Sequence, residues 1–178
     1  MFEKGDFMFN PIELSNDKKD NYETMLQMLQ GLIQGEKNII ANLSNASSLF
    51  SYFVKEINWV GFYIYDELDN ELVLGPFQGL PACVRIKPES GVCGASYSMQ
   101  TMLVVPNVHT FKNHIACDGA TNSEIVLPIM IDKKVWGVLD IDSPKFDRFD
   151  GIDEEYLEKA VALIEKEIKK SLKIKKKQ

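Results

Sequence analysis

The spacing of hydrophobic residues changes twice along the chain. Apolar residues recur at helical spacing from about residue 18 to 56, at alternate positions in segments between 58 and 149, and at helical spacing again from about 153 to 174. A period near 3.6 indicates an amphipathic helix, whereas strict alternation indicates a strand with one buried face. The pattern therefore predicts N-terminal helices, a central run of short strands and one C-terminal helix.

The N-terminal region is predicted to contain two helices. The first runs from about Lys18 to Ile33 and the second from about Glu36 to Glu56, with Gly31 and Gly35 interrupting the pattern. The second helix has an apolar stripe of Ile39, Ile40, Leu43, Ala46, Phe50, Phe53 and Val54. The inward face of the C-terminal helix consists of Tyr156, Leu157, Ala160, Val161, Ile164, Ile168 and Leu172.

The strand pattern begins at NWVGFYIYD, where Val60, Phe62 and Ile64 alternate with Trp59, Gly61, Tyr63 and Tyr65. Further strands are predicted at ELVLGPF, ACVRI, MLVVP, SEIVLPIM and KVWGVLDID, with a helix start at 92–95 and a polar loop over 107–122. Short turns between successive strands give an antiparallel sheet, and helices gathered at the two ends give an α+β architecture. With no internal repeat or low-complexity linker in 178 residues, we expect one domain.

Charge and composition restrict the class of partner. The net charge is −6 and the pI is near 5.0, which argues against nucleic-acid binding because phosphate contacts need a basic face. The lysine-rich C-terminal run KKSLKIKKKQ is expected to be a solvated tail. No signal-peptide pattern and no membrane-length apolar stretch occurs, so we expect a cytoplasmic protein that does not bind membranes.

Three acidic residues are predicted to share one patch of the sheet. Asp140 and Asp142 are two positions apart in a strand, so both side chains point to one face. Glu124 lies on the preceding hairpin arm, and a three-residue turn over 132–134 would place it opposite Asp142. A slip of one residue would break this pairing.

Such a patch repels itself unless a cation binds it or one acid retains a proton through a raised pKa. It could therefore hold the ammonium group of a small ligand, or supply a general acid. The alternative is that the acids face solvent at a sheet edge. A metal site is a weaker interpretation: His109 and His114 lie in the nearby loop, but their spacing matches no strong ligand pattern, and we predict no metal.

All three cysteines, Cys83, Cys93 and Cys117, lie within the stretch 83–117. Cys117 is in a small, polar loop, where a thiol can be reached. Cys83 shares a predicted strand face with Arg85, which could favour its thiolate, and Cys93 lies at a predicted helix start, where the pKa of a thiol is lowered. Alternatively, each could be an inert, buried residue. Together they suggest a cycle of sulfenic acid, disulfide and reduction by an external dithiol.

Several segments resemble a known family. NWVGFYIYD, LVLGPFQG, ACVRI, GVCG, VVPNVH, HIACD, SEIVLPI and GVLDIDSP occur in the order found in free methionine-(R)-sulfoxide reductases, which are single GAF-domain enzymes. The resemblance covers about Asn58 to Phe149, and the helical flanks also fit. It implies one GAF domain over 1–178, with N-terminal helices at about 18–56, sheet and active-site loops at about 58–149 and a C-terminal helix at about 153–174.

The resemblance also implies an activity and a role for each site residue. Free L-methionine (R)-sulfoxide would be reduced to methionine, with thioredoxin as external reductant and no cofactor. The implied catalytic set is Cys117 as nucleophile, Cys83 as principal resolving cysteine and Cys93 as a third cysteine in recycling. The implied substrate pocket consists of the acids Glu124, Asp140 and Asp142 and the aromatic residues Trp59 and Tyr63.

Two other interpretations remain open at this point. A GAF domain could instead be a sensor that binds a small ligand and regulates a partner in trans, or the cysteines could be purely structural. Thiol titration before and after addition of methionine sulfoxide separates these, because an enzyme loses two thiols per chain. The long amphipathic helices could also serve a homodimer, although no sequence feature fixes its interface.

Overall fold

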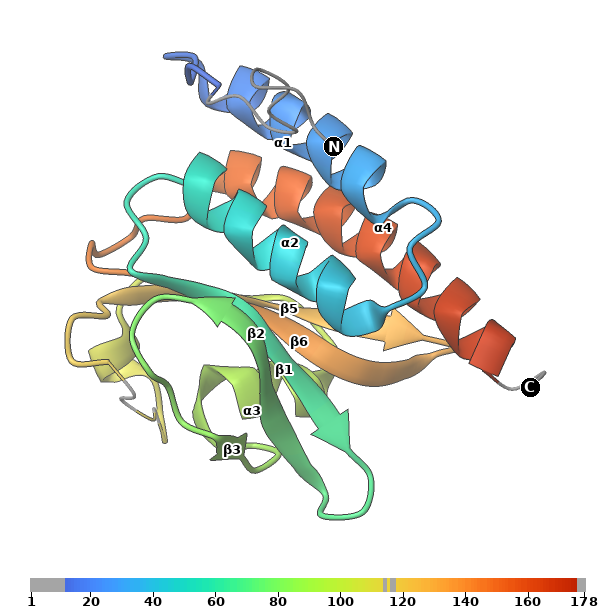
Figure 1. The fold of residues 1–178 in the computed structure, drawn as a ribbon. Coiled ribbons are helices and arrows are strands. Elements are labelled where there is room, and N and C mark those ends of the chain that lie inside the picture. The colour runs from blue at the N-terminus through green and yellow to red at the C-terminus, as the bar shows by residue number, and fades with distance from the viewer. Residues whose placement is uncertain (1–11, 114, 116–117, 176–178) are drawn as a thin grey trace.

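The computed structural model describes residues 12–113, 115 and 118–175, and it consists of a sheet between two unequal helical layers (Figure 1). Three helices cover one face of the sheet and one short helix covers the other. The helices are α1 (Lys18–Ile33), α2 (Ile39–Phe53), α3 (Gly91–Met99) and α4 (Gly151–Lys175), with a 3-10 turn at Val108–Thr110. The strands are β1 (Trp59–Asp66), β2 (Glu71–Gln78), β3 (Arg85–Ile86), β4 (Leu103–Val105), β5 (Ser123–Ile131) and β6 (Lys134–Ser143).

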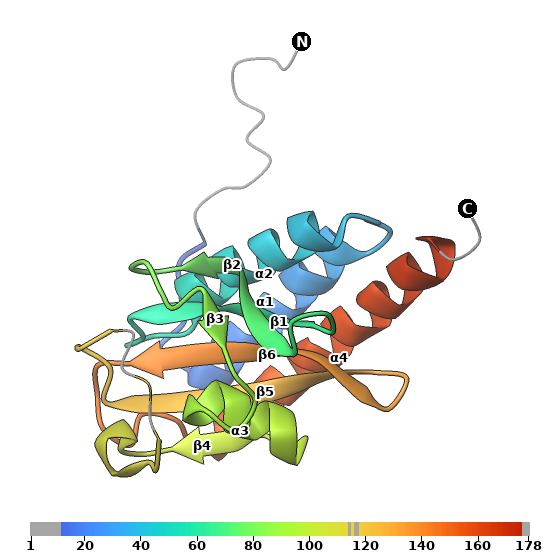
Figure 2. The ribbon, with the colours of Figure 1, turned by 90° about the horizontal axis from the view of Figure 1, so that it is seen from below.

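The six strands form one antiparallel sheet in the order β3-β2-β1-β6-β5-β4. The helices α1, α2 and α4 lie together on one side, and α3 lies on the other side between the two sheet edges (Figures 1 and 2). The predicted α+β class is therefore confirmed. None of the helices in the described part of the chain is long and apolar enough to cross a membrane.

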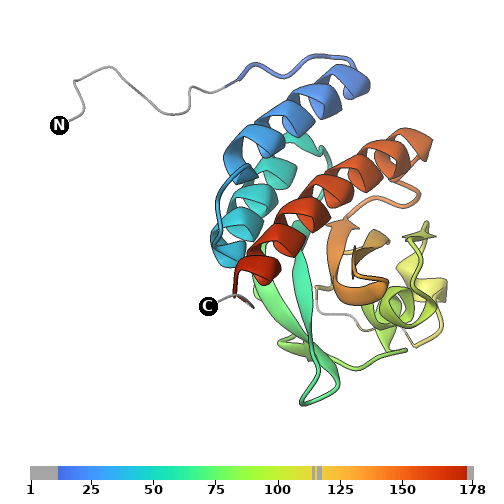
Figure 3. The same ribbon diagram turned by 90° about the vertical axis from the view of Figure 1, so that its right-hand side faces the viewer.

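Alternation along β1 divides the interior into two cores. Val60 and Phe62 pack with the long helices, whereas Trp59 and Tyr63 pack on the opposite face with α3. The separation of the helical layer from the α3 side is clear when the sheet is seen edge-on (Figure 3). The side that carries Trp59 and Tyr63 is therefore available for a ligand site, while the helix side is filled by core residues.

Element boundaries differ most from the prediction at two places. The second helix is shorter than predicted, because the side chain of Asn38 caps it by accepting a hydrogen bond from the N–H of Ala41 at 3.1 Å. Ile40, placed by the prediction on the apolar stripe, is 55% exposed. The predicted strand ACVRI is also shorter, since only Arg85 and Ile86 pair with β2.

The hairpin between β5 and β6 has the predicted register, but its turn differs from the predicted one. Its turn has two central residues, Asp132 and Lys133, with φ of 50° and 68°, and not the three that the sequence suggested. That turn alone would place Glu124 opposite Ile141. The register shifts by one residue beyond Met130, where Trp136 is the extra residue on β6. Because of this bulge, Glu124 pairs with Asp142, so the predicted pairing is confirmed and the predicted turn is wrong.

A buried carboxylate joins α1 to the start of α4. The side chain of Asp153 is fully buried and accepts hydrogen bonds from the Lys18 ammonium (2.6 Å) and the Tyr22 hydroxyl (2.6 Å). The Arg148 guanidinium and the backbone N–H of Asp150 also donate to it, each at 2.9 Å. All four donors lie close to one end of the helical layer, so Asp153 fixes how α1 sits on α4.

We predict that Asp153→Ala destabilises the protein by about 3–5 kcal/mol, because the Arg148 guanidinium loses its buried carboxylate and the Tyr22 hydroxyl its acceptor, while Lys18 keeps only Asp150. The measurement is a urea unfolding curve. Glu155→Gln is the control, since Glu155 lies on the same helix but pairs with Lys159 at the exposed surface. Equal unfolding midpoints for the two variants would contradict the proposed role of Asp153.

Candidate functional site

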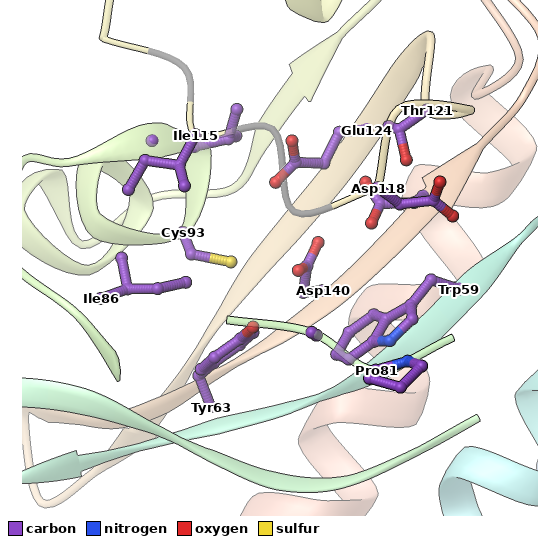
Figure 4. Close-up of a pocket in the computed structure, with 14 residues that line it drawn as sticks. Trp59, Tyr63, Pro81, Ile86, Cys93, Ile115, Asp118, Thr121, Glu124 and Asp140 are labelled. Carbon is purple, nitrogen blue, oxygen red and sulfur yellow. The ribbon is translucent and has the colours of Figure 1, made fainter. Parts of the chain in front are cut away.

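A cavity opens on the α3 side of the sheet (Figure 4). Its volume is about 40 Å³, room for roughly three water molecules. The wall combines sheet residues, α3 and two loops, and it consists of Trp59, Tyr63, Pro81, Ala82, Ile86, Gly91, Val92, Cys93, Ile115, Asp118, Thr121, Glu124, Asp140 and Asp142.

The three predicted acids, which we call the acid cluster (Glu124, Asp140 and Asp142), all line this cavity. Glu124 and Asp140 are each only 6% exposed, and Asp142 is partly buried. They lie on the adjacent strands β5 and β6, which have neighbours on both sides in the sheet. The alternative that these acids face solvent at a sheet edge is therefore wrong.

Burial and mutual repulsion change the protonation of the acid cluster. Burial raises the pKa of Glu124 well above its usual range, and the charges of Asp140 and Asp142 raise it further. Burial also raises the pKa of Asp142, followed by the charge of Asp140. Burial raises the pKa of Asp140 to about 6, while hydrogen bonds with Cys93 and Glu124 oppose the rise. Asp140 is thus the acid that most readily carries the negative charge, and a protonated Glu124 can donate to it.

Cys93 lies beside the acid cluster on α3. Its side chain is 3% exposed, and its sulfur and carboxylate oxygens of Glu124 and Asp140 all lie within 4.8 Å of one another. Burial raises the pKa of the Cys93 thiol well above its usual value, and the charges of Asp140 and Glu124 add to this effect. The expectation that a helix N-terminus lowers this pKa is therefore wrong, because burial and two acids outweigh the dipole of a nine-residue helix.

The donor set does not match a structural zinc site. Cys93, Glu124 and Asp140 could each offer one ligand atom, but structural zinc sites have four protein ligands, mostly cysteine and histidine. His109 does not line the cavity; its side chain is exposed and hydrogen-bonded to Asn122 at 2.8 Å, and His114 lies outside the described residues. Within the described part of the chain, one buried oxygen of Asp140 has no hydrogen-bond partner. Such an orphan acceptor suits a ligand that brings its own donor, such as an ammonium group.

Trp59 and Tyr63 form an aromatic wall on β1. The Trp59 ring stacks on Phe77 with centroids 5.4 Å apart, and on Tyr63 with centroids 6.0 Å apart. Gly61 lies between them on the same face, and a Cβ there would come within 2.5 Å of the Trp59 ring. Glycine at position 61 therefore leaves the space that the indole occupies. Both predicted aromatic residues line the cavity.

The other two cysteines are placed differently from Cys93. Cys83 precedes β3, is half-buried and is disulfide-bonded, whereas Cys117 lies outside the described residues. Arg85 is engaged by Asp69 at 2.8 Å and by Glu71 at 3.4 Å at the exposed surface. Strand β3 begins at Arg85 and does not include Cys83. The prediction that Cys83 and Arg85 share a strand face is therefore wrong.

Sequence reasoning missed a polar contact at the rim of the cavity. The Asn58 side chain donates to a carboxylate oxygen of Asp118 at 2.8 Å and to the hydroxyl of Thr121 at 3.1 Å. Asp118 and Thr121 both line the cavity, on the segment that follows the third cysteine in sequence. The only available signal was the position of Asn58 next to a predicted strand. The contact fixes the loop 118–121 against the start of β1.

Comparison with known proteins identifies the family. The sequence profile of the GAF domain family matches residues 40–168 of this chain. The free methionine-R-sulfoxide reductase of Escherichia coli (strain K12) is 45% identical over 150 residues, which cover 84% of this chain and 90% of that protein. The chain belongs to the free methionine-R-sulfoxide reductase family of GAF-domain proteins.

Two solved structures of free methionine-R-sulfoxide reductases share this fold over nearly their whole length. The structure from Neisseria meningitidis, in complex with its substrate, has a TM-score of 0.89 and 35% identity, covering 94% of this chain and 99% of that one. The reduced form of fRMsr from Staphylococcus aureus has a TM-score of 0.80 and 48% identity, covering 90% and 99%. The resemblance inferred from the sequence is therefore confirmed.

The raised pKa values of the acid cluster predict a pH-dependent stability. Glu124 keeps its proton in the folded state at pH values where the unfolded chain has lost it, so stability falls as pH rises above about 4. Glu124→Gln removes this effect and can still donate to Asp140. We expect the variant to gain a few degrees in melting temperature at pH 8 and to gain almost nothing at pH 4.

The control for that experiment is Glu67→Gln, which changes an exposed acid in the turn between β1 and β2. Its melting temperature should follow that of the unmodified protein across the whole pH range. A loss of stability in Glu124→Gln at pH 8 would show that Glu124 is held as a charged group and contradict the assignment.

Proposed function

We propose that the protein reduces free L-methionine (R)-sulfoxide to L-methionine by thiol chemistry. Membership of the free methionine-R-sulfoxide reductase family supports the reaction class. The observation that carries the proposal for this chain is the buried acid cluster with its orphan oxygen on Asp140, which shares one cavity with an aromatic wall. None of the described residues that line the cavity is cationic, and a free amino acid would supply that group.

The acid cluster would select the free amino acid over a peptide-bound residue. In a peptide, the nitrogen of methionine sulfoxide is an uncharged amide, whereas the free amino acid carries an ammonium group. That ammonium would bind Asp140 and Asp142, since a nearby cation favours the charged form of both acids. Trp59 and Tyr63 would then contact the methyl-sulfinyl end of the substrate. Metal and cofactor have no role in this scheme.

The proposed reaction has three thiol steps, and the first two take place within the enzyme. The thiolate of Cys117 would attack the sulfoxide sulfur while the sulfoxide oxygen takes up a proton. That oxygen would then pass from the substrate sulfur to the Sγ of Cys117 as the transient sulfur–sulfur bond breaks, which gives a sulfenic acid on Cys117 and free methionine. The Cys83 thiol then displaces hydroxide from the sulfenic acid, which gives a disulfide and water. A protonated Glu124 or Asp142 would supply the proton for the first step.

Thioredoxin would return the enzyme to its dithiol state by thiol–disulfide exchange. The disulfide bond at Cys83 supports a redox role for this residue. Cys93 would serve as the third cysteine of the cycle, in slower alternative disulfides, because its thiol is buried and its raised pKa keeps it protonated. A reducing compartment, the cytoplasm, would supply the reductant. A homodimer remains a prediction.

A GAF sensor that binds a small ligand and regulates a partner is the rival function. It needs a cavity but no thiol chemistry, so it leaves the disulfide at Cys83 without a role. Titration of free thiols in the pre-reduced protein, before and after addition of methionine sulfoxide, distinguishes the two, because an enzyme loses two thiols per chain and a sensor loses none.

Cysteine substitutions test the catalytic order. We expect Cys117→Ser to form no methionine from the (R)-sulfoxide with dithiothreitol present. Cys83→Ser should form about one methionine per chain in a single turnover and then recycle poorly. Product is measured by separate assays of the (R) and (S) free sulfoxides. Repeated turnover by Cys117→Ser, or equal use of both stereoisomers, would contradict the proposal.

Neutral replacements of the acids test the source of the proton. Asp142→Asn and Glu124→Gln keep the shape of the side chains but remove their acidity. If one of them is the general acid, its replacement lowers kcat by about 10²-fold or more, while loss of ammonium binding alone raises KM. Steady-state kinetics on the free (R)-sulfoxide separates the two effects. An unchanged kcat in both variants would contradict the proposal that either acid is the general acid.

A further inference from the structure

We propose that the segment 80–84, between β2 and β3, is the docking surface for the protein dithiol that reduces the disulfide at Cys83; this rests on the proposed function. Two large apolar side chains in this segment face solvent: Leu80 is 63% exposed and Val84 is 64% exposed. Between them, Pro81 and Ala82 line the cavity and Cys83 is disulfide-bonded. The segment therefore places exposed apolar side chains on both sides of the disulfide-bonded residue.

The backbone of this segment is fixed from the inside. The carbonyl of Leu80 accepts a hydrogen bond from the Trp59 indole at 3.1 Å, and the carbonyl of Cys83 accepts one from the Tyr63 hydroxyl at 2.9 Å. The carbonyl of Val84 accepts from the N–H of Leu74 at 3.0 Å. The segment is thus held in shape by β1 and β2, and the exposed side chains of Leu80 and Val84 add little to that support. A partner would meet a preformed surface.

The surface composition fits a protein and not a small charged reductant. The stretch 76–84, PFQGLPACV, contains no charged side chain, in a chain of which 26% of the residues are charged. Depletion of charge and exposed apolar residues are typical of the centre of a protein interface. The negative charge carried by Asp140 in the cavity would also repel a reducing thiolate, which favours an approach over the uncharged stretch 76–84.

The partner dithiol supplies both electrons that reduce the disulfide. A thiolate of the incoming dithiol attacks one sulfur of the disulfide, the sulfur–sulfur bond breaks, and the released thiolate takes up a proton. The second thiol of the partner then attacks the mixed disulfide, which frees the other enzyme sulfur as a thiol. The partner leaves oxidised by two electrons. Because Cys83 is half-buried, the partner must contact the protein surface around it to reach the sulfur. Leu80 and Val84 are the exposed apolar residues of that surface.

The test compares a protein reductant with a small one. Leu80→Ser and Val84→Ser are prepared with Leu68→Ser as a matched control, since Leu68 is 95% exposed in the turn between β1 and β2. We expect each of the first two variants to raise the KM for reduced thioredoxin roughly fivefold or more, as lost apolar contacts do. Activity with dithiothreitol should stay unchanged, and Leu68→Ser should behave like the unmodified protein with both reductants.

A direct measurement separates this inference from the proposed enzyme activity. The oxidised protein is mixed with reduced thioredoxin without any sulfoxide, and the appearance of thiols in the protein is followed by mass spectrometry after alkylation. Slower exchange in Leu80→Ser and Val84→Ser supports the docking surface even if no sulfoxide is reduced. Unchanged exchange, an equal loss with dithiothreitol, or a change only in self-association measured by sedimentation would each overturn it.

Discussion

The candidate site depends on the register between β5 and β6. Side chains alternate along a strand, so a shift of one residue moves every side chain of β5 to the other face relative to its partner. With the two-residue turn alone, Glu124 would lie opposite Ile141, a residue of the helix-side core. The bulge at Trp136 adds one residue and aligns Glu124 with Asp142. One extra residue in a strand therefore decides whether the acid cluster exists.

Burying the acid cluster opposes folding, and the surrounding structure must offset that cost. Two acids that are almost fully buried and a third beside them cannot all be ionised without a cation, and their raised pKa values reflect this. Extensive apolar cores on both faces of the sheet supply the compensating stability. A ligand that brings an ammonium group would relieve this repulsion, so part of its binding free energy would come from the repulsion that burial creates among the acids.

Much of the fold could be read from the sequence because its periodic patterns are strong. The alternation of Val60 and Phe62 with Trp59 and Tyr63 separated the two cores correctly, and the two-residue spacing of Asp140 and Asp142 placed both on the cavity face. The turn at 132–133 and the bulge were not visible, because compensating one-residue changes leave the hydrophobic pattern intact. Contacts between distant segments, such as Asn58 with Asp118, carry no periodic signal at all.

The environment of a residue, and not its local motif, determined the behaviour of Cys93. The sequence placed this cysteine at a helix start, where a dipole favours a thiolate, yet burial and the acid cluster reverse the direction of the pKa change. The negative charge of the acid cluster also affects which molecules can approach the site. A cavity that attracts an ammonium group repels a thiolate, so substrate and reductant are expected to approach through different surfaces. The uncharged stretch 76–84 fits that expectation, because it exposes the apolar side chains of Leu80 and Val84 on either side of Cys83.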